Sequence, residues 1–244
     1  MIRAFSQSQL TQLGNRLKVG VTADDLRILD EYRRSFGPAC ERVIHTIKTV
    51  LGLHPTARPA KSTQAIVEKL NRLSSRLGQM QDIAGCRITV DSLGYQDIAV
   101  ERLKEQYPDC RVEDRRLKPS HGYRAVHVIV RVDDFWVEVQ IRTELQHLWA
   151  SLSEKMADTY GIGIKYGVGG PGPMGLLTQV ANFVVWLEDE EAKLETRMLN
   201  SDRGDEAAVE HLLELRNEHE WARAELIAFV EFQLAFLKSD RTLT

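Results

Sequence analysis

Polar residues that could carry out chemistry recur at strand-like spacing near the middle of this 244-residue chain. Residues 124–132 and 135–142 alternate between apolar and polar side chains, and Asp133-Asp134 between them predicts a two-residue hairpin turn. That turn sets a register in which one face carries a polar cluster: His127, Glu138, Gln140 and Arg142. An imidazole, a carboxylate, an amide and a guanidinium on one surface are typical of an active site on a β-sheet.

The same alternation has a simpler interpretation. A half-exposed antiparallel hairpin normally has one apolar and one polar face. The apolar face here consists of aliphatic residues: Val126, Val128, Val130, Val132, Val137, Val139 and Ile141. Glu138 and Arg142 would then be solvated neighbours with no chemical role. The pattern alone favours neither interpretation.

Periodicity also predicts the elements that surround this hairpin. Helices are expected over residues 8–53 in several pieces, 63–74, 92–106, and from 144 to Gly161 or Gly163, where Thr143 and Gln146 form a capping box. Strands are expected over residues 83–90 and 111–117. A Gly- and Pro-rich loop over residues 161–173 should precede two long helices, 174–200 and 205–238. Helices before and after a small sheet predict an α+β fold.

Composition narrows the class of protein further. The net charge is −3, with no global excess of basic residues for binding nucleic acid. Cys40, Cys86 and Cys110 are too widely spaced for a disulfide framework or a zinc site, and they suit a reducing cytoplasm. No apolar run approaches the roughly 18 residues of a membrane span. We therefore expect a cytoplasmic protein with no membrane partner.

Two further segments have residue types suited to nucleotide chemistry. Residues 56–69 (TARPAKSTQAIVEK) place three cations around a predicted helix start, where phosphates bind well: Arg58, Lys61 and Lys69. Residues 79–90 (QMQDIAGCRITV) place Asp82 before a strand, Gly85 where backbones can approach closely, and Arg87 within the strand. Each segment by itself is a weak signal, and a basic loop is more often only solvated.

Taken together, these segments resemble the RelA/SpoT-type synthetase domain, the family that makes the (p)ppGpp alarmones. The family's basic ATP loop precedes a helix, and its later motifs follow in the same order as here. They correspond to residues 82–87 (DIAGCR), 122–127 (GYRAVH), 138–143 (EVQIRT) and 149–150 (WA). The resemblance covers about residues 56–156, and four linked motifs make it specific.

The resemblance implies a nucleotidyltransferase-like mixed sheet flanked by helices. We expect a helical segment over 1–55, a synthetase core over 56–162 and a helical extension over 174–244. No His/Asp-rich hydrolase domain precedes the core, so the chain is expected to be a small stand-alone synthetase. Such an enzyme moves the pyrophosphate of ATP to a nucleotide 3′-hydroxyl and releases AMP.

The resemblance also implies roles for the matching residues. Asp82 and Glu138 would bind Mg²⁺, and Glu138 could accept the proton of the attacking hydroxyl. ATP would be bound by four cations, the two arginines around adenine and the two lysines on phosphates: Arg58, Arg87, Lys61 and Lys69. The acceptor would be bound by Tyr123, stacked on its base, with His127 and Gln140 orienting it. Arg142 would either contact phosphate or form a structural ion pair.

The chain departs from the family pattern at two places. The ATP loop has Arg58-Pro-Ala-Lys61 where the family usually has R-x-K, which weakens the case for Arg58. His147 replaces an Asn that in the family helps to read guanine, which weakens the case for a guanosine acceptor. The acceptor set nevertheless includes His147 and Lys118. With Lys118, Arg115 and Arg116 form a basic patch that suits phosphates or a tRNA, or is simply a solvated edge strand.

Three functions therefore stay open. The first is a pyrophosphotransferase that makes (p)ppGpp from GDP or GTP. The second is a toxin of the same family that modifies the 3′ end of tRNA and is neutralised by an antitoxin protein. The third is an inactive relative that binds a nucleotide or a partner, against which the presence of both Asp82 and Glu138 argues. Homo-oligomers fit all three.

Other charged segments have no expected role. Residues 188–191 (EDEE) are predicted to be a solvated helix face. His211 and His219 form no metal-binding pattern and are predicted to be ordinary surface residues.

Overall fold

The computed structural model describes residues 5–58, 60–72, 76–201 and 206–239. The elements before the hairpin are α1 (Gln7–Val19), α2 (Ala23–Arg34), α3 (Gly37–Thr46), β1 (Thr56–Arg58), α4 (Thr63–Arg72), β2 (Ala84–Val90), α5 (Leu93–Gln106) and β3 (Arg111–Asp114). The hairpin and the elements after it are β4 (Val126–Val132), β5 (Phe135–Thr143), α6 (Glu144–Tyr160), α7 (Pro171–Asn200) and α8 (Glu206–Ser239). Short helical turns lie at Ile47–Leu51, Leu77–Gln79 and Ile162–Tyr166.

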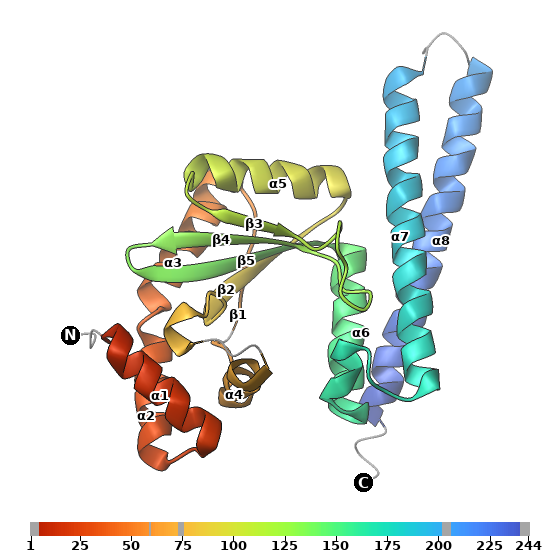
Figure 1. Ribbon diagram of the computed structural model, residues 1–244. Coiled ribbons are helices and arrows are strands. Elements are labelled where there is room, and N and C mark those ends of the chain that lie inside the picture. Colours follow the sequence, from red (N-terminus) through yellow and green to blue (C-terminus); the bar gives the residue numbers. More distant parts are fainter. Residues whose placement is uncertain (1–4, 59, 73–75, 202–205, 240–244) are drawn as a thin grey trace. The chain divides into compact units, whose positions relative to one another are not determined.

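The strands form one sheet in the order β1-β2-β5-β4-β3, which confirms the predicted α+β fold (Figure 1). The alternating hairpin is confirmed as β4 and β5, with Asp133 of the turn at a positive φ of 52°. Every residue of β5 from Val137 to Thr143 is buried, because β5 has a strand on each side. The central strand of the sheet is therefore the one that carries the polar motif.

The first strand, β1, lies within residues 56–69, where a basic loop leading to a helix was expected, and it corrects that expectation. β1 pairs antiparallel with β2, with Thr56 opposite Arg87 and Arg58 opposite Gly85. Three residues are too few to show an alternating pattern, so β1 is recognisable only from its partner strand. The consequence for the site is direct, because the pairing fixes Arg58 on the sheet.

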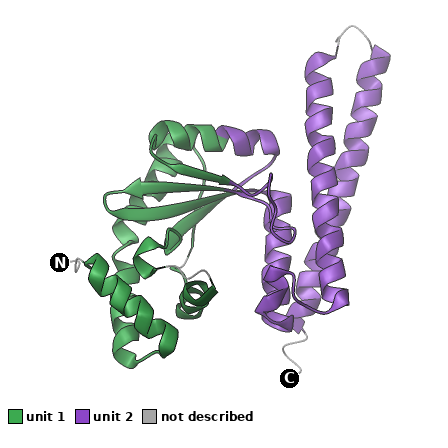
Figure 2. Cartoon of the chain, viewed as in Figure 1, with its two compact units in different colours: residues 1–88, 99–113, 127–141 green, residues 89–98, 114–126, 142–244 purple. Residues whose placement is uncertain are grey.

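The chain divides into two compact units (Figure 2). Unit 1 comprises residues 1–88, 99–113 and 127–141, and unit 2 comprises residues 89–98, 114–126 and 142–244. The N-terminal helices belong to the unit that holds most of the sheet, whereas α6, α7 and α8 belong to the other. The boundaries expected at residues 55 and 162 stay a prediction.

Unit 1 buries an apolar cluster between its helices and the start of β2. The members are Leu10, Leu13, Leu17, Leu29, Tyr32, Phe36, Ile66, Leu70, Leu77, Met80 and Ile83. Thr22 caps α2, because its hydroxyl accepts the Asp25 N–H at 3.1 Å. This cluster fixes α4, which carries Lys69, and the residues on either side of Asp82.

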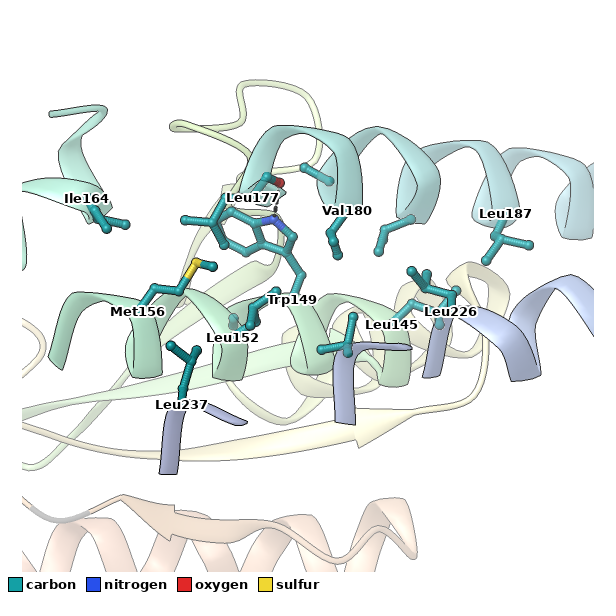
Figure 3. Close-up of a cluster of buried hydrophobic side chains, with 14 residues drawn as sticks. Leu145, Trp149, Leu152, Met156, Ile164, Leu177, Val180, Leu187, Leu226 and Leu237 are labelled. Atoms are coloured by element: carbon teal, nitrogen blue, oxygen red, sulfur yellow. Dashed lines mark hydrogen bonds between the residues drawn. The ribbon is translucent and has the colours of Figure 1, made fainter. Parts of the chain in front are cut away.

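Unit 2 is built on α6, α7 and α8, which pack together around one apolar cluster (Figure 3). Leu145, Leu152 and Met156 of α6 meet Leu177, Val180 and Leu187 of α7, with Leu226 and Leu237 from α8. Trp149 lies within this cluster, and its indole N–H donates to the Leu177 carbonyl at 2.9 Å. The capping box at Thr143 and Gln146 is present, so α6 begins directly after Arg142 as predicted.

Three predictions for the C-terminal part are wrong. α7 begins at Pro171 inside the predicted loop, because proline suits the first turn of a helix. Glu188 is 1% exposed, not solvated, since it lies four residues after buried Val184 on the same helix face. His219 is also buried, with its Nε2 atom 2.9 Å from the Leu187 carbonyl oxygen. Among the described residues, no helix is long and apolar enough to cross a membrane.

Candidate active site

Glu138 lies at the centre of a buried polar cluster on β5 and its neighbours in unit 1. Its Oε2 atom accepts from Arg58 Nη1 at 2.6 Å and from Gln140 Nε2 at 2.8 Å. Its Oε1 atom lies 2.9 Å from His127 Nδ1. Burial alone would raise the pKa of Glu138, but His127, Arg58 and Gln140 outweigh burial and lower the pKa to about 2. Glu138 is therefore a firmly ionised carboxylate.

The solvated interpretation of the hairpin's polar face is wrong for both residues that it concerns. Glu138 is 7% exposed and Arg142 is 3% exposed. Buried charges persist only where partners satisfy them, and Glu138 has three. Such an arrangement is typical of a functional site more than of a solvent-facing strand.

A second carboxylate in unit 1, which is half-buried, is held by two lysines. Asp82 Oδ2 lies 2.7 Å from Lys61 Nζ and 2.9 Å from Lys69 Nζ. Burial alone would raise the pKa of Asp82, but Lys61 and Lys69 outweigh burial and lower it. The Lys61 amide also donates to the Ile83 carbonyl at 3.0 Å, which ties the basic loop to the residue after Asp82. The predicted ATP-phosphate lysines thus share one carboxylate.

The two arginines predicted to bind adenine lie on the same face of the sheet. Because Thr56 is opposite Arg87 and Arg58 is opposite Gly85, the two arginines are diagonal neighbours across β1 and β2. Gly85 is required for the packing of β2 on β5, since a Cβ atom there would overlap the Glu138 carbonyl oxygen. In this structure Arg58 contacts Glu138, so stacking on adenine requires its side chain to turn away.

The donor chemistry of this cluster fits a divalent cation such as Mg²⁺, which prefers carboxylate oxygens. Asp82 Oδ1 is buried and has no hydrogen-bond partner among the described residues. Both oxygens of Glu138 already face donors, so an ion there would have to displace at least one of them. Within the described residues, no group of three or more His, Cys, Asp or Glu side chains could hold a metal ion. Substrate phosphates would have to complete the coordination.

Tyr123, which is predicted to stack on the acceptor base, lies in unit 2 and contacts Arg142. Arg142 Nη2 donates to the Tyr123 hydroxyl at 3.0 Å, and its guanidinium carbon lies 5.1 Å from the centre of the Tyr123 ring. The Tyr123 and Trp149 rings are 6.4 Å apart. Tyr123, Trp149, Lys165 and Tyr166 help to line a cavity of about 180 Å³. Tyr123 therefore has an adjoining space and a buried cation that orients its hydroxyl.

The remaining acceptor residues are divided between the two units. His127 and Gln140 both contact Glu138 in unit 1. His147 lies in the first turns of α6 and is partly exposed, whereas Lys118 is exposed. Both belong to unit 2, with Tyr123.

The basic patch at residues 115–118 is less basic than its sequence suggests. Arg116 is 2.8 Å from Asp97 and 2.7 Å from Asp114, and its side chain is only 17% exposed. β3 ends at Asp114, so these residues follow the edge strand and do not belong to it. Arg116 is therefore ion-paired within unit 2, and the contact of Arg115, Arg116 and Lys118 with phosphate or tRNA stays a prediction.

Three residues without a predicted functional role form part of a buried polar network in unit 2: Gln96, Arg124 and Glu188. Glu188 could have been recognised from its four-residue spacing to Val184. Arg124 lies within the GYR motif but had no assigned role. Gln96 carries no sequence signal, because a single Gln in an amphipathic helix is ordinarily exposed.

In this α+β fold, a buried and a half-buried carboxylate, each paired with cationic side chains, define a candidate polyphosphate-binding site. Residues 58–162 match the family described as the region found in RelA/SpoT proteins. This part of the chain is a RelA/SpoT-type domain, as the sequence motifs predicted.

Curated relatives match over part of their length. An uncharacterized protein of Mycobacterium tuberculosis is 43% identical over 111 residues, which cover 44% of this chain and 41% of that protein. GTP pyrophosphokinase YwaC of Bacillus subtilis is 31% identical over 118 residues, 41% of this chain and 56% of that protein. The chain therefore spans less than two thirds of each of these relatives.

Solved structures share the fold. Small alarmone synthetase 1 from Bacillus subtilis aligns over 70% of this chain and 100% of its own, with a TM-score of 0.56 and 23% identity. A protein of Streptococcus mutans UA159 aligns over 77% of this chain and 99% of its own, with a TM-score of 0.53 and 25% identity.

Proposed function

We propose that this RelA/SpoT-type domain moves the β,γ-pyrophosphate of ATP to the 3′-hydroxyl of GDP or GTP and thereby makes (p)ppGpp. The observation that carries the proposal is the pair of carboxylates, half-buried Asp82 and buried Glu138, each held by cations. The predicted site in unit 1 has two carboxylates and four cations, so it has positive charge for binding a polyphosphate. The cations are Arg58, Lys61, Lys69 and Arg87.

In the proposed reaction, the acceptor oxygen bonds to the β-phosphorus of ATP. The bond from that phosphorus to the α–β bridging oxygen breaks, and AMP leaves. Lys61 and Lys69 bind the phosphates, and Arg58 and Arg87 bind the adenine. When Arg58 moves from Glu138 to the nucleotide, Glu138 loses a stabilising cation and becomes a better base for the hydroxyl proton. Mg²⁺ held by Asp82 and Glu138 would neutralise charge that develops on the phosphates.

Relatives support the alarmone as the first choice of product. Bacillus subtilis small alarmone synthetase 1 has solved structures bound to its product pppGpp and to AMPCPP. YwaC is named a GTP pyrophosphokinase. The flat Tyr123 ring beside a cavity of about 180 Å³ suits stacking on a guanine base in this chain too.

A tRNA 3′ end is the second candidate acceptor. It is favoured by His147 in place of the expected Asn and by the cations Arg115 and Lys118. This function would require a neutralising antitoxin in the cell. An inactive relative is the weakest candidate, because buried charges that serve no purpose are costly to retain. Self-association and an antitoxin both stay predictions.

Transfer of label from [γ-³²P]ATP tests the proposal. The protein is incubated with Mg²⁺ and GDP, GTP or bulk tRNA in separate reactions, and labelled products are separated by thin-layer chromatography and gel electrophoresis. Label in GDP or GTP supports alarmone synthesis, and label only in tRNA supports the toxin. If no acceptor gains label above the Glu138→Gln control, the proposed transfer is wrong.

A further inference from the structure

A ring of polar groups in unit 2, linked by four hydrogen bonds and completed by one longer ion pair, joins the C-terminal helix α7 to the acceptor motif. Gln146 Nε2 donates to Glu188 Oε1 at 2.8 Å, and Gln96 Nε2 donates to Gln146 Oε1 at 3.0 Å. Arg116 Nη1 donates to Gln96 Oε1 at 3.2 Å. Arg124 Nη1 donates to the Arg116 carbonyl at 3.2 Å, and its Nε lies 3.5 Å from Glu188 Oε2.

The burial of these groups makes the ring an interdependent structure. Gln96, Gln146 and Glu188 are at most 1% exposed. In such surroundings a polar atom that loses its partner cannot turn to water instead, so removal of one member costs its neighbours a contact that water does not replace. The ring thus joins four separate segments: α5, residues 114–126, the start of α6, and α7.

The two carboxylate oxygens of Glu188 contact residues that are sequence neighbours of Tyr123 and Arg142. Its Oε1 atom also accepts from the Thr143 hydroxyl at 2.6 Å, and Thr143 directly follows Arg142. Its Oε2 atom faces Arg124, which directly follows Tyr123. Arg142 and Tyr123 are themselves bonded at 3.0 Å. The Glu188 carboxylate therefore contacts the residue that follows Tyr123 and the residue that follows Arg142 in the sequence.

We propose that Glu188 is a positioning residue that holds Tyr123 and Arg142 in the arrangement that binds the acceptor. This inference rests on the proposed function and deepens it. It makes α7 a working part of the acceptor site, although α7 lies beyond the segment that matches the family. The residues predicted to bind ATP lie in unit 1, so we expect Glu188 to affect them less.

The variant Glu188→Gln keeps an oxygen for Thr143 and Gln146 but removes the charge that faces Arg124. Glu188→Ala removes both. Parent and variants are compared with the matched control Glu195→Gln, an exposed glutamate two turns along the same helix. Michaelis constants for ATP and for the labelled acceptor, GDP or tRNA, are measured separately, at a temperature where circular dichroism shows every protein folded.

The expected result is a split between the two substrates. Glu188→Ala should raise the Michaelis constant for the acceptor at least tenfold and leave that for ATP within about twofold, with Glu188→Gln between it and the parent. A merely structural role would lower the melting temperature and the active fraction without separating the two constants. Equal acceptor constants for parent and folded variants would overturn the positioning role.

A second variant covers the case in which Glu188→Ala does not fold. Gln96→Ala opens the ring on the opposite side and contacts neither Thr143 nor Arg124 in the hydrogen bonds described above. It should raise the acceptor constant in the same way, and combined with Glu188→Gln its effect should be less than additive. Additive or absent effects would overturn the proposal. A parent that labels no acceptor would instead overturn the proposed function itself.

Discussion

Arg58 Nη1 lies 2.6 Å from Glu138 Oε2, so a cation predicted to bind ATP is paired with the predicted catalytic carboxylate. The Arg58 side chain is 33% exposed, whereas that of Glu138 is 9% exposed. In the proposed function, a nucleotide that competes for Arg58 would remove a cation that keeps Glu138 ionised. This relationship connects ATP binding to the state of Glu138, and the first prediction depends on it.

Glu138→Gln should lower transfer by at least about a hundredfold, the scale of losing one key electrostatic or acid–base group. The variant also loses the charge that Arg58 and His127 face, so the free energy of unfolding should fall by about 1–3 kcal/mol. Labelled transfer and urea unfolding measure the two effects. Near-normal turnover in the folded variant would remove Glu138 from the chemistry.

Lys61→Ala and Lys69→Ala should each weaken binding of a non-hydrolysable ATP analogue by about tenfold, or about 1.4 kcal/mol. Because both lysines share Asp82 Oδ2, the double variant should lose less than the sum of the two. Isothermal titration calorimetry measures the affinities, with exposed Lys104→Ala as the control. Strict additivity would mean that the two lysines act on separate groups.

Tyr123→Ala should raise the Michaelis constant for the acceptor by an amount equivalent to about 1–3 kcal/mol, the range for stacking on a base. Tyr123→Phe keeps the ring and loses only the hydroxyl that Arg142 contacts, so its effect should be smaller. Steady-state kinetics measure the Michaelis constant for the acceptor in each variant, with exposed Tyr95→Ala as the control. An unchanged acceptor constant in Tyr123→Ala would contradict the stacking role.

The tRNA alternative is tested at Arg115 and not at Arg116, whose removal would also open the buried ring. If a tRNA backbone crosses this surface, Arg115→Ala should weaken tRNA modification and flatten its salt dependence by a slope of about 1. The GDP or GTP reaction should stay the same. Exposed Lys193→Ala on α7 is the matched control. Identical salt slopes for both variants and the parent would exclude Arg115 as a tRNA contact.

The stability of the protein should depend on pH through Glu188. Burial is the main reason that the pKa of Glu188 is raised above 4.5, against the opposing effects of Thr143, Arg124 and Gln146. The folded state then binds the proton more tightly than the unfolded state, so Glu188 lowers the free energy of unfolding as pH rises above about 4.5. Urea unfolding across this pH range should show a smaller decline for Glu188→Gln than for the parent. A parallel decline would contradict the raised pKa.

Local patterns in the sequence were enough to predict most of the elements and the residues of the motif. The β4–β5 hairpin follows from alternation and a two-residue turn, and α6 follows from its capping box. These signals lie within a few residues of each other, so they do not depend on the rest of the fold. β1 was missed because a three-residue strand is defined by its partner, and a single sequence does not reveal partners at that distance.

The sequence by itself determined which chemical groups the domain has, since Asp82, Glu138 and the basic residues follow from residue type and spacing. Only the tertiary structure decided how these groups are paired: Arg58 with Glu138, two lysines with Asp82, and Arg116 with aspartates in place of solvent. It also showed that Glu188, which was predicted to be solvated, is buried and belongs to the ring. The physical reason is that burial and ion pairing depend on which distant segments pack together, and packing is a property of the whole chain.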